Sequence, residues 1–228
     1  FAEILGENIM CGYRYNISIG DGGRTNSNTG RTFWISDYAG SNTRRIGSAP
    51  GYNCSSEENE SNCNESKKNY SDIDFALRLT QKKNDNEVGF FIAQEKDEAY
   101  SIGRDYFALR ARTKVNDKTI GYMVTQVIDD LNSTTSTVNV FDYIQVKSDK
   151  LKLYTDLLVS EKENQSGLGF RTQFVYLPTK FTKTSGSILY FEDDFKLNDF
   201  GYLQRNDWVH LGVGADVKKI DFDGSSAI

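Results

Sequence analysis

The side chains best suited to bind a ligand or a metal ion crowd one stretch near the end of the chain. Asn198, Asp199, Arg205, Asn206 and Asp207 lie close together there, after the acidic run Glu192-Asp-Asp194. Carboxylate and amide oxygens are the ligands that hard divalent cations prefer, so Asp193 and Asp194 are candidate metal ligands. The alternative is that these Asn and Asp residues stabilise turns through their own side chains.

Two further groups near the start of the chain have binding chemistry. Gly20-Asp-Gly-Gly23 could form a backbone nest that binds an anion, or a cation together with Asp21, although a tight glycine loop explains it equally. Arg44 and Arg45 could grip a carboxylate or phosphate, or form a structural ion pair. Trp34 could stack on a sugar ring or pack under a loop. The candidate ligand-binding residues are therefore Trp34, Arg44, Arg45, Asp199, Arg205 and Asp207.

Catalytic machinery is not evident in the chain. Its single histidine, His210, has no Ser or Cys at a spacing that indicates a triad. Acidic pairs suited to glycoside hydrolysis are numerous, but the sequence does not give their separation. An enzyme is the less favoured interpretation, with a hydrolase that uses loop carboxylates as one alternative. We expect no cofactor.

Three cysteines occur, at positions 11, 54 and 63. Cys54 and Cys63 flank a polar stretch and are a candidate disulfide, which would indicate an oxidising, extracytoplasmic compartment. Two unrelated thiols in a loop are the other possibility.

Composition limits the class of protein. The 228 residues carry a net charge of −5, which argues against nucleic-acid binding. No apolar run reaches the ~18 residues of a membrane helix, whereas a membrane β-strand needs only about 10 residues with alternate positions apolar. Thirteen Tyr, fourteen Phe and only two Pro favour β structure.

Strict alternation of apolar and polar residues predicts antiparallel strands over most of the chain. The predicted strands are 73–80, 88–95, 106–115, 119–128, 137–147, 151–160, 167–177, 186–193 and 207–218. Short turns at 82–87, 116–118 and 148–150 alternate with longer stretches at 96–105, 129–136, 160–166 and 194–206, as in outer-membrane barrels. One strand departs from the rule, because Asp142 shares a face with Val138 and Val140. We expect either an interfacial Asp142 or a bulge that shifts the register.

The predicted fold is an all-β, antiparallel, up-and-down outer-membrane-type barrel, part of a larger one. Residues 1–72 would form an irregular segment, a plug or loop region, and 73–228 the barrel strands. A soluble sandwich shares the alternation. The barrel predicts that the following residues face lipid, whereas the sandwich predicts that they are buried: Ile73, Phe75, Leu77, Leu109, Leu153, Phe170, Val209 and Leu211.

Several motifs resemble a bacterial family, the domain-of-unknown-function 5916 family, in family order along nearly the whole chain. Phe1-Ala-Glu-Ile-Leu-Gly-Glu-Asn-Ile9 is similar to its FF-x-EG-x-x-x-F run, and residues 20–26 resemble its GDGG stretch. Arg44-Arg-Ile-Gly-Ser-Ala-Pro50 resembles SRRIGRAP, and residues 194–207 resemble F-x-x-N-D-x-G-F-x-x-R-N-D. The chain departs from these motifs at Ala2, Thr43 and Ser48.

The resemblance implies an outer-membrane-type β-barrel domain that follows a family-nine carbohydrate-binding-like domain. We therefore expect a bacterial outer-membrane barrel that passes, holds or presents a ligand, linked to polysaccharide handling. Its partners would be the lipid bilayer and a carbohydrate or another envelope protein. The alternatives are a soluble sandwich that binds carbohydrate and the hydrolase. We expect both chain ends to be truncations.

Overall fold

The computed structural model describes residues 38–39, 45–54, 60–147, 150–179, 181–203 and 205–217. Asp21, Trp34 and Arg44 are not among these residues, so the expectations for them lie outside the described part of the chain.

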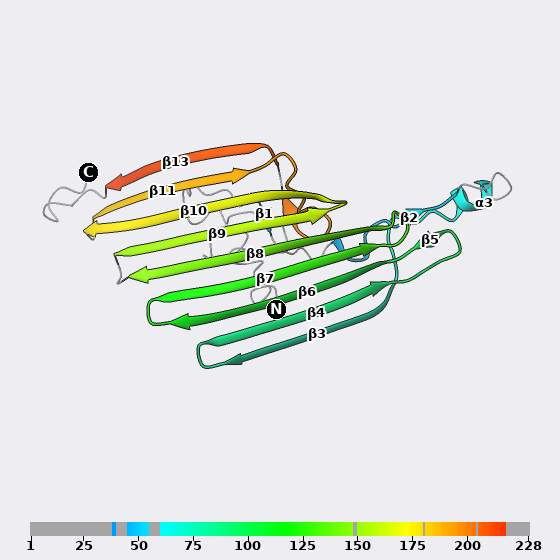
Figure 1. Cartoon of the computed structure of the whole chain (residues 1–228), viewed down its shortest axis with the longest axis horizontal. Coiled ribbons are helices and arrows are strands. Elements are labelled where there is room, and N and C mark those ends of the chain that lie inside the picture. Colours follow the sequence, from blue (N-terminus) through cyan, green and yellow to red (C-terminus); the bar gives the residue numbers. More distant parts are fainter. Residues whose placement is uncertain are drawn as a thin grey trace, which may run out of the picture.

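A single nine-stranded antiparallel sheet dominates the fold (Figure 1), with the strand order β13-β11-β10-β9-β8-β7-β6-β4-β3. Apart from two short strands that lie in the long connections, neighbours in this order also follow one another along the chain, so the sheet is an up-and-down meander. The strands are β3 (Ile73–Lys83), β4 (Asn86–Glu95), β6 (Arg104–Val115), β7 (Lys118–Asp129), β8 (Thr134–Lys147), β9 (Leu151–Lys162), β10 (Gln165–Thr179), β11 (Thr182–Phe191) and β13 (Trp208–Val217). The predicted antiparallel, all-β class is confirmed. The sheet is open, with β3 and β13 at its two edges.

The two rims of the sheet differ in their connections. At one rim, which we call the turn rim, neighbouring strands are joined by two- or three-residue turns, such as the one at Asn84. The opposite rim, the loop rim, carries the long connections 96–103 and 192–207. The expectation of a longer stretch at 160–166 was wrong, because β9 and β10 continue to a tight turn. Glu163 and Asn164 both have positive φ there, as a two-residue type I′ hairpin requires.

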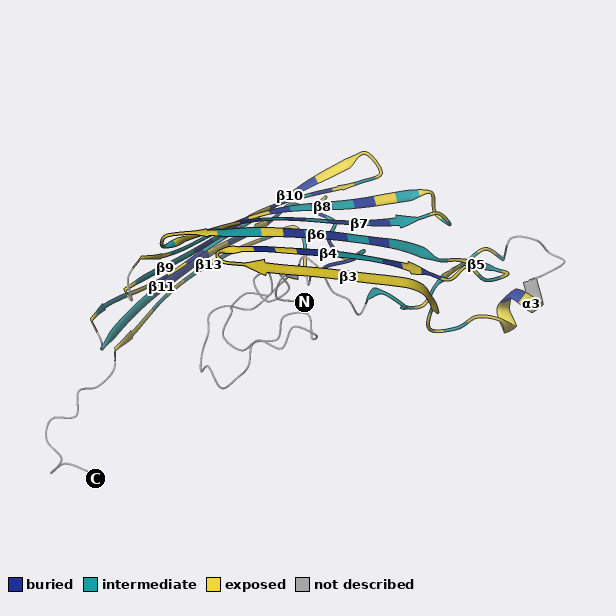
Figure 2. Cartoon of the chain, turned by 90° about the horizontal axis from the view of Figure 1, so that it is seen from below, coloured by how far each residue is buried: buried dark blue, intermediate teal, exposed yellow. Residues whose placement is uncertain are grey.

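One face of the sheet, the outer face, is apolar and exposed. Along strands such as β7, buried residues alternate with less buried ones (Figure 2). Its exposed side chains include Leu211 at 70%, Phe141 at 52% and Leu157 at 40% of their free surface. Charged residues occupy outer-face positions only near strand ends, at Lys83, Asp105, Lys118, Lys147 and Glu161. Several polar groups of this face pair with each other: Tyr122 with Asn139, Gln126 with Thr137, and Thr155 with Thr172.

The sandwich alternative is not favoured, because among the described residues no second large sheet covers this apolar face. Phe75, Leu77, Val209 and Leu211 are exposed, and the other predicted outward residues of the regular strands are partly exposed. Ile73 does not follow the alternation that places the other predicted residues on the outer face. A β-bulge between it and Phe75 pairs Ile73 with Glu95, a residue of the opposite face.

The other face, the inner face, holds the buried side chains, including charged ones. Asp142 belongs to it, together with Val138 and Val140. Both explanations expected for Asp142 were wrong: the register of β8 is continuous, and Asp142 is buried at 2% exposure, in an ion pair with Arg110. The alternation was misread because Val138 and Val140 point inward.

Connection 192–207, which we call the return loop, folds onto the inner face beside the loop rim. Its Phe195, Leu197 and Leu203 join a core cluster with inward residues such as Met123 and Leu158. Phe200 completes a second cluster with Tyr106, whose ring centroid lies 5.4 Å away. Each fully buried apolar side chain contributes about 1.5–3 kcal/mol, so the return loop is a packed part of the fold.

A small arm extends from the loop rim (Figure 1). Strands β2 (Gly51–Tyr52) and β5 (Ser101–Ile102) pair in it, and helix α3 (Glu60–Glu65) follows. A disulfide joins Cys54 to Cys63, one of the two alternatives left open by the sequence. Lys68 Nζ donates to Glu98 Oε1 over 2.6 Å, and this hydrogen bond is the main reason that the pKa of Lys68 is raised.

Within the described residues, no helix has the length and apolarity to cross a membrane.

Candidate ligand site at the loop rim

Two segments from opposite ends of the chain meet at Arg45. Its Nε donates to the carbonyl of Gly201, and its Nη2 donates to Oδ1 of Asn198, both over 3.4 Å. Two of the motifs singled out in the sequence, around 44–50 and 194–207, are therefore in contact. Short strands β1 (Tyr38–Ala39) and β12 (Tyr202–Leu203) also pair beside this contact.

Glu95 fixes the turn that carries Arg45. Its carboxylate, 2% exposed, accepts from the backbone N–H of Gly47 over 2.8 Å, from Tyr106 Oη over 3.1 Å and from Arg104 Nε over 2.9 Å. Arg104 Nη2 also donates to Ser48 Oγ over 2.9 Å. A buried carboxylate with this many donors is held in one position, so the turn is anchored to the ends of β4 and β6.

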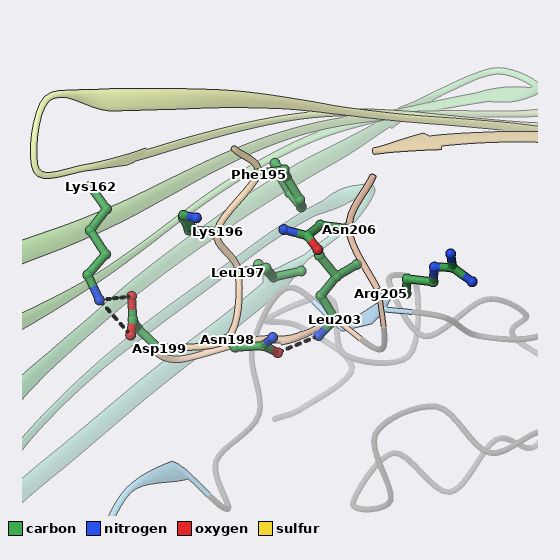
Figure 3. Close-up of a pocket in the computed structure, with 9 residues that line it drawn as sticks. All are labelled: Lys162, Phe195, Lys196, Leu197, Asn198, Asp199, Leu203, Arg205 and Asn206. Atoms are coloured by element: carbon green, nitrogen blue, oxygen red, sulfur yellow. Dashed lines mark hydrogen bonds and ion pairs between the residues drawn. The ribbon is translucent and has the colours of Figure 1, made fainter. Parts of the chain in front are cut away.

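The return loop is anchored by Lys162, the last residue of β9. Its Nζ lies 3.1 Å from both carboxylate oxygens of Asp199. Asn198 Oδ1 also accepts from the backbone N–H of Leu203 over 2.7 Å (Figure 3). These contacts hold the polar edge of the return loop, while its apolar side chains face the core.

Two cavities flank the Lys162–Asp199 ion pair. The polar cavity, of about 220 Å³, is lined by Arg45, Ser48, Arg104, Val127, Asp129, Thr134, Ser136, Lys162, Asn198 and Asp199. The loop cavity, of about 190 Å³, is lined by Lys162, Phe195, Lys196, Leu197, Asn198, Asp199, Leu203, Arg205 and Asn206. Figure 3 shows Arg205 extending away from the Lys162–Asp199 pair. The arrangement can offer hydrogen bonds to a small polar molecule.

The structure brings some of the predicted ligand residues together and separates others. Arg45 and Asp199 line the polar cavity, and Asp199 and Arg205 line the loop cavity. Asp207 lines neither. It has a positive φ of 49°, and its N–H donates to the carbonyl of Glu192, so it shapes the turn before β13.

The predicted cation site is not assembled in the part of the chain that the structure describes. No group of three or more His, Cys, Asp or Glu side chains suited to a metal ion occurs there. Asp193 instead accepts from the backbone N–H of Asp194 over 3.0 Å, and the carbonyl of Asp193 accepts from Asn206 over 2.6 Å.

Sequence reasoning missed Glu95, Arg104, Tyr106 and Lys162. Each sits near the end of an alternating strand, at a position that faces inward. Their inward position in the alternation and their place near a strand end were the signals that the sequence offered. These signals did not reveal which loop the four side chains would meet.

A second polar feature crosses the middle of the inner face. Residues in one lateral register follow each other from strand to strand: Lys82, Glu87, Arg112, Gly121, Asp142, Asp156, Arg171, Leu189 and His210. We call this the charge row. Arg171 pairs with Asp156, and Arg110 reaches in from the next register to pair with Asp142.

Two carboxylates near the loop rim are held by other groups. Glu192 accepts from the backbone N–H of Leu168 over 2.8 Å, and Asp199 is paired with Lys162. His210 lies beside Trp208, with ring centroids 5.8 Å apart. The geometry assigns no reaction.

No family model and no curated protein matches the chain. The resemblance to the domain-of-unknown-function 5916 family therefore stays a prediction. Among solved structures, the chain is similar to OmpTdeltaL8, a loop L8 deletion mutant of OmpT, an outer membrane protein of Vibrio cholerae. The TM-score is 0.42 and the identity 15%, over 65% of this chain and 54% of that one. The chain thus matches about half the length of that protein, and a similarity at this level assigns it neither a fold nor a role.

Proposed function

We propose that this chain forms part of the wall of an outer-membrane β-barrel that embeds in a bilayer and holds or passes a polar ligand on its inner side. The observation that carries the proposal is the inverted distribution of side chains. Aliphatic and aromatic groups are exposed on the outer face, while Arg110, Asp142, Asp156 and Arg171 are almost fully buried on the inner face.

Such an outer face is expected in a bilayer and not in water. Soluble monomers rarely expose contiguous apolar patches larger than a few hundred Å². Charged side chains on a barrel's lipid-facing side are tolerated near the interfaces and penalised at the midplane. Lys118 is the first residue of β7, at the turn rim, and Glu161 lies next to the last residue of β9, at the loop rim, so both fit this rule. The cross-strand hydrogen bonds of outer-face Thr, Tyr, Asn and Gln also satisfy polar groups that hydrocarbon would leave unpaired.

Strand direction indicates how the barrel would close. Because all neighbours are antiparallel and the sheet has nine strands, edge strands β3 and β13 run in the same direction. Direct pairing of these edges would produce a parallel junction. Antiparallel junctions at both edges need an odd number of further strands, which gives the even total usual in bacterial outer-membrane barrels. The open sheet is then one portion of a larger barrel.

The loop rim would face the outside and the turn rim the periplasm, as the lengths of the connections suggest. A disulfide in the loop-rim arm agrees with an oxidising compartment. From the family resemblance we infer a link to polysaccharide handling.

Depth-dependent quenching tests the proposal. Leu157→Trp would be placed in a Trp34→Phe/Trp208→Phe background and reconstituted into bilayers with lipids brominated near the acyl-chain ends. We expect strong quenching at position 157 and weak quenching of the matched Thr135→Trp variant, which reports on the loop rim of the same face. Equal, weak quenching at both positions, with a monodisperse protein in plain buffer, would refute the membrane assignment.

A further inference from the structure

We infer that the polar cavity, beside the Lys162–Asp199 pair, binds an uncharged polyhydroxylated molecule of saccharide type. The inference rests on the proposed function, since it names the ligand held on the inner side of the barrel. At about 220 Å³ the polar cavity is smaller than the ~300–1,000 Å³ typical of small-molecule sites, so it suits a small ligand.

The charges of the polar cavity balance, which argues against a strongly charged ligand. Arg104 is neutralised by Glu95, and Lys162 by Asp199. The remaining cation, Arg45, contacts neutral oxygen acceptors, and the remaining anion is Asp129, which lies opposite Arg104 in register. Because these charges sum to zero, the polar cavity offers no net counter-charge to an ionic ligand, whereas an uncharged ligand costs less to transfer from water.

Both donors and acceptors remain available in the polar cavity. Arg45 and Arg104 each donate hydrogen bonds to the protein through Nε and Nη2. The Nη1 group of each arginine can therefore donate to a ligand. Asp129 accepts one bond at each oxygen, from Asn132, and a carboxylate has about four acceptor sites. Ser136 and Thr134 add hydroxyl groups that donate and accept. A sugar hydroxyl, which does both at once, matches this mixture.

The position of the site selects a water-soluble ligand. The return loop packs on the inner face, through residues such as Leu197 and Phe195, so the cavities lie on the side away from the apolar outer face. Among the described residues that line the polar cavity, Val127 is the only aliphatic one. Lipid acyl chains therefore have neither access nor a matching surface.

Ligand-observed NMR on the full chain, folded in detergent, tests the inference. The probes are glucose, galactose, mannose, N-acetylglucosamine and their β-linked dimers, with galacturonate as the anionic comparison. We expect saturation transfer to at least one neutral sugar, and at least tenfold weaker binding after Asp129→Asn or Ser136→Ala. The matched controls, Asp130→Asn and Thr135→Ala, change neighbours that line neither cavity and should leave binding unchanged.

The outcomes separate this inference from the proposed function. Binding of galacturonate alone, or no binding by any neutral sugar to a protein that inserts in bilayers, overturns the inference and leaves the barrel intact. Equal sensitivity of the lining and control variants overturns it as well. Sugar binding that depends on Asp129 in a protein that does not insert would support the site and refute the barrel.

Discussion

Asp142 and Asp156 lie directly opposite each other on the neighbouring strands β8 and β9, and each carboxylate is paired with a different arginine. Two like charges in this arrangement repel each other, and both are at most 2% exposed. The arginines therefore make the charge row tolerable, because Arg110 neutralises one carboxylate and Arg171 the other. The two ion pairs join β6 to β8, across Gly121 of β7, and β9 to β10 through side chains as well as through the backbone.

Removal of one member of a buried pair should destabilise the sheet strongly. Asp142→Leu leaves the guanidinium of Arg110 buried without its counter-ion, and we expect the free energy of unfolding to fall by about 3–5 kcal/mol. Urea unfolding of the detergent-folded protein measures it. The double variant Arg110→Met/Asp142→Leu removes both charges and should recover most of the loss. A single-variant cost below about 1 kcal/mol would show that water already solvates this pair.

Gly121 makes the Arg110–Asp142 contact possible. It lies opposite Asp142 in register, on the strand between β6 and β8, and a Cβ built there would come within 2.6 Å of Arg110 Nη2, closer than real Cβ contacts. Gly121→Ala should therefore destabilise the folded protein. We expect the cost to shrink in an Asp142→Ala background, because the clash then has room to relax. The four unfolding free energies of this double-mutant cycle measure the coupling. Additive effects would contradict the steric explanation.

Much of the sheet follows from the sequence, because a period of two is a local signal. Alternation in 208–217 places Val209, Leu211 and Val213 on one face whatever the rest of the chain does. The exceptions occur where a second influence acts locally. The bulge before Phe75 moves Ile73 into the register of the other face, and inward valines beside Asp142 blur the contrast between the faces.

The site is less accessible to sequence reasoning, because it depends on contacts between distant segments. The motif around Arg45 and the run around Asn198 were both visible, but nothing local shows that they meet across 153 positions. Lys162 was assigned to a long connection, since its polar neighbours hid the continuation of β9 to a tight turn. Only the three-dimensional return of 192–207 onto the inner face makes it a partner of Asp199.

Insertion of a charge in the middle of the outer face should separate a membrane wall from a soluble sheet. Leu157 is 40% exposed on β9, next to the central strand of the sheet, so Leu157→Arg would change stability by at most about 0.5 kcal/mol in a soluble protein. In a bilayer the same variant should cost about 2–4 kcal/mol. Unfolding in lipid vesicles measures it, with Glu161→Arg, at the loop-rim end of the same strand and face, as the control. Equal costs at both positions would argue against the bilayer.

The disulfide should stabilise the arm without supporting the sheet. Cys54 and Cys63 are nine positions apart, and the contacts of the arm with β4 and β6 run through loop 96–103. Cys54→Ser/Cys63→Ser should make the arm a site of rapid proteolysis, while the unfolding transition of the sheet stays in place. Limited trypsin digestion followed by mass spectrometry locates the cut. A lowered midpoint for the whole protein would show that the arm is part of the cooperative unit.

The return loop depends on a glycine beneath it. Gly167 of β10 faces inward under the backbone of residues 194 and 195, and a Cβ there would lie 2.5 Å from the carbonyl carbon of Asp194. Gly167→Ala should therefore lift the loop from the sheet and weaken the contact of Lys162 with Asp199. We expect faster proteolysis within 192–207 and weaker sugar binding, with the strand content by circular dichroism unchanged. Ser166→Ala, the exposed neighbour on the outer face, is the matched control. If Gly167→Ala left both the proteolysis and the binding unchanged, the return loop would not need close backbone contact with β10, and the site would rest on the Lys162 and Arg45 contacts alone.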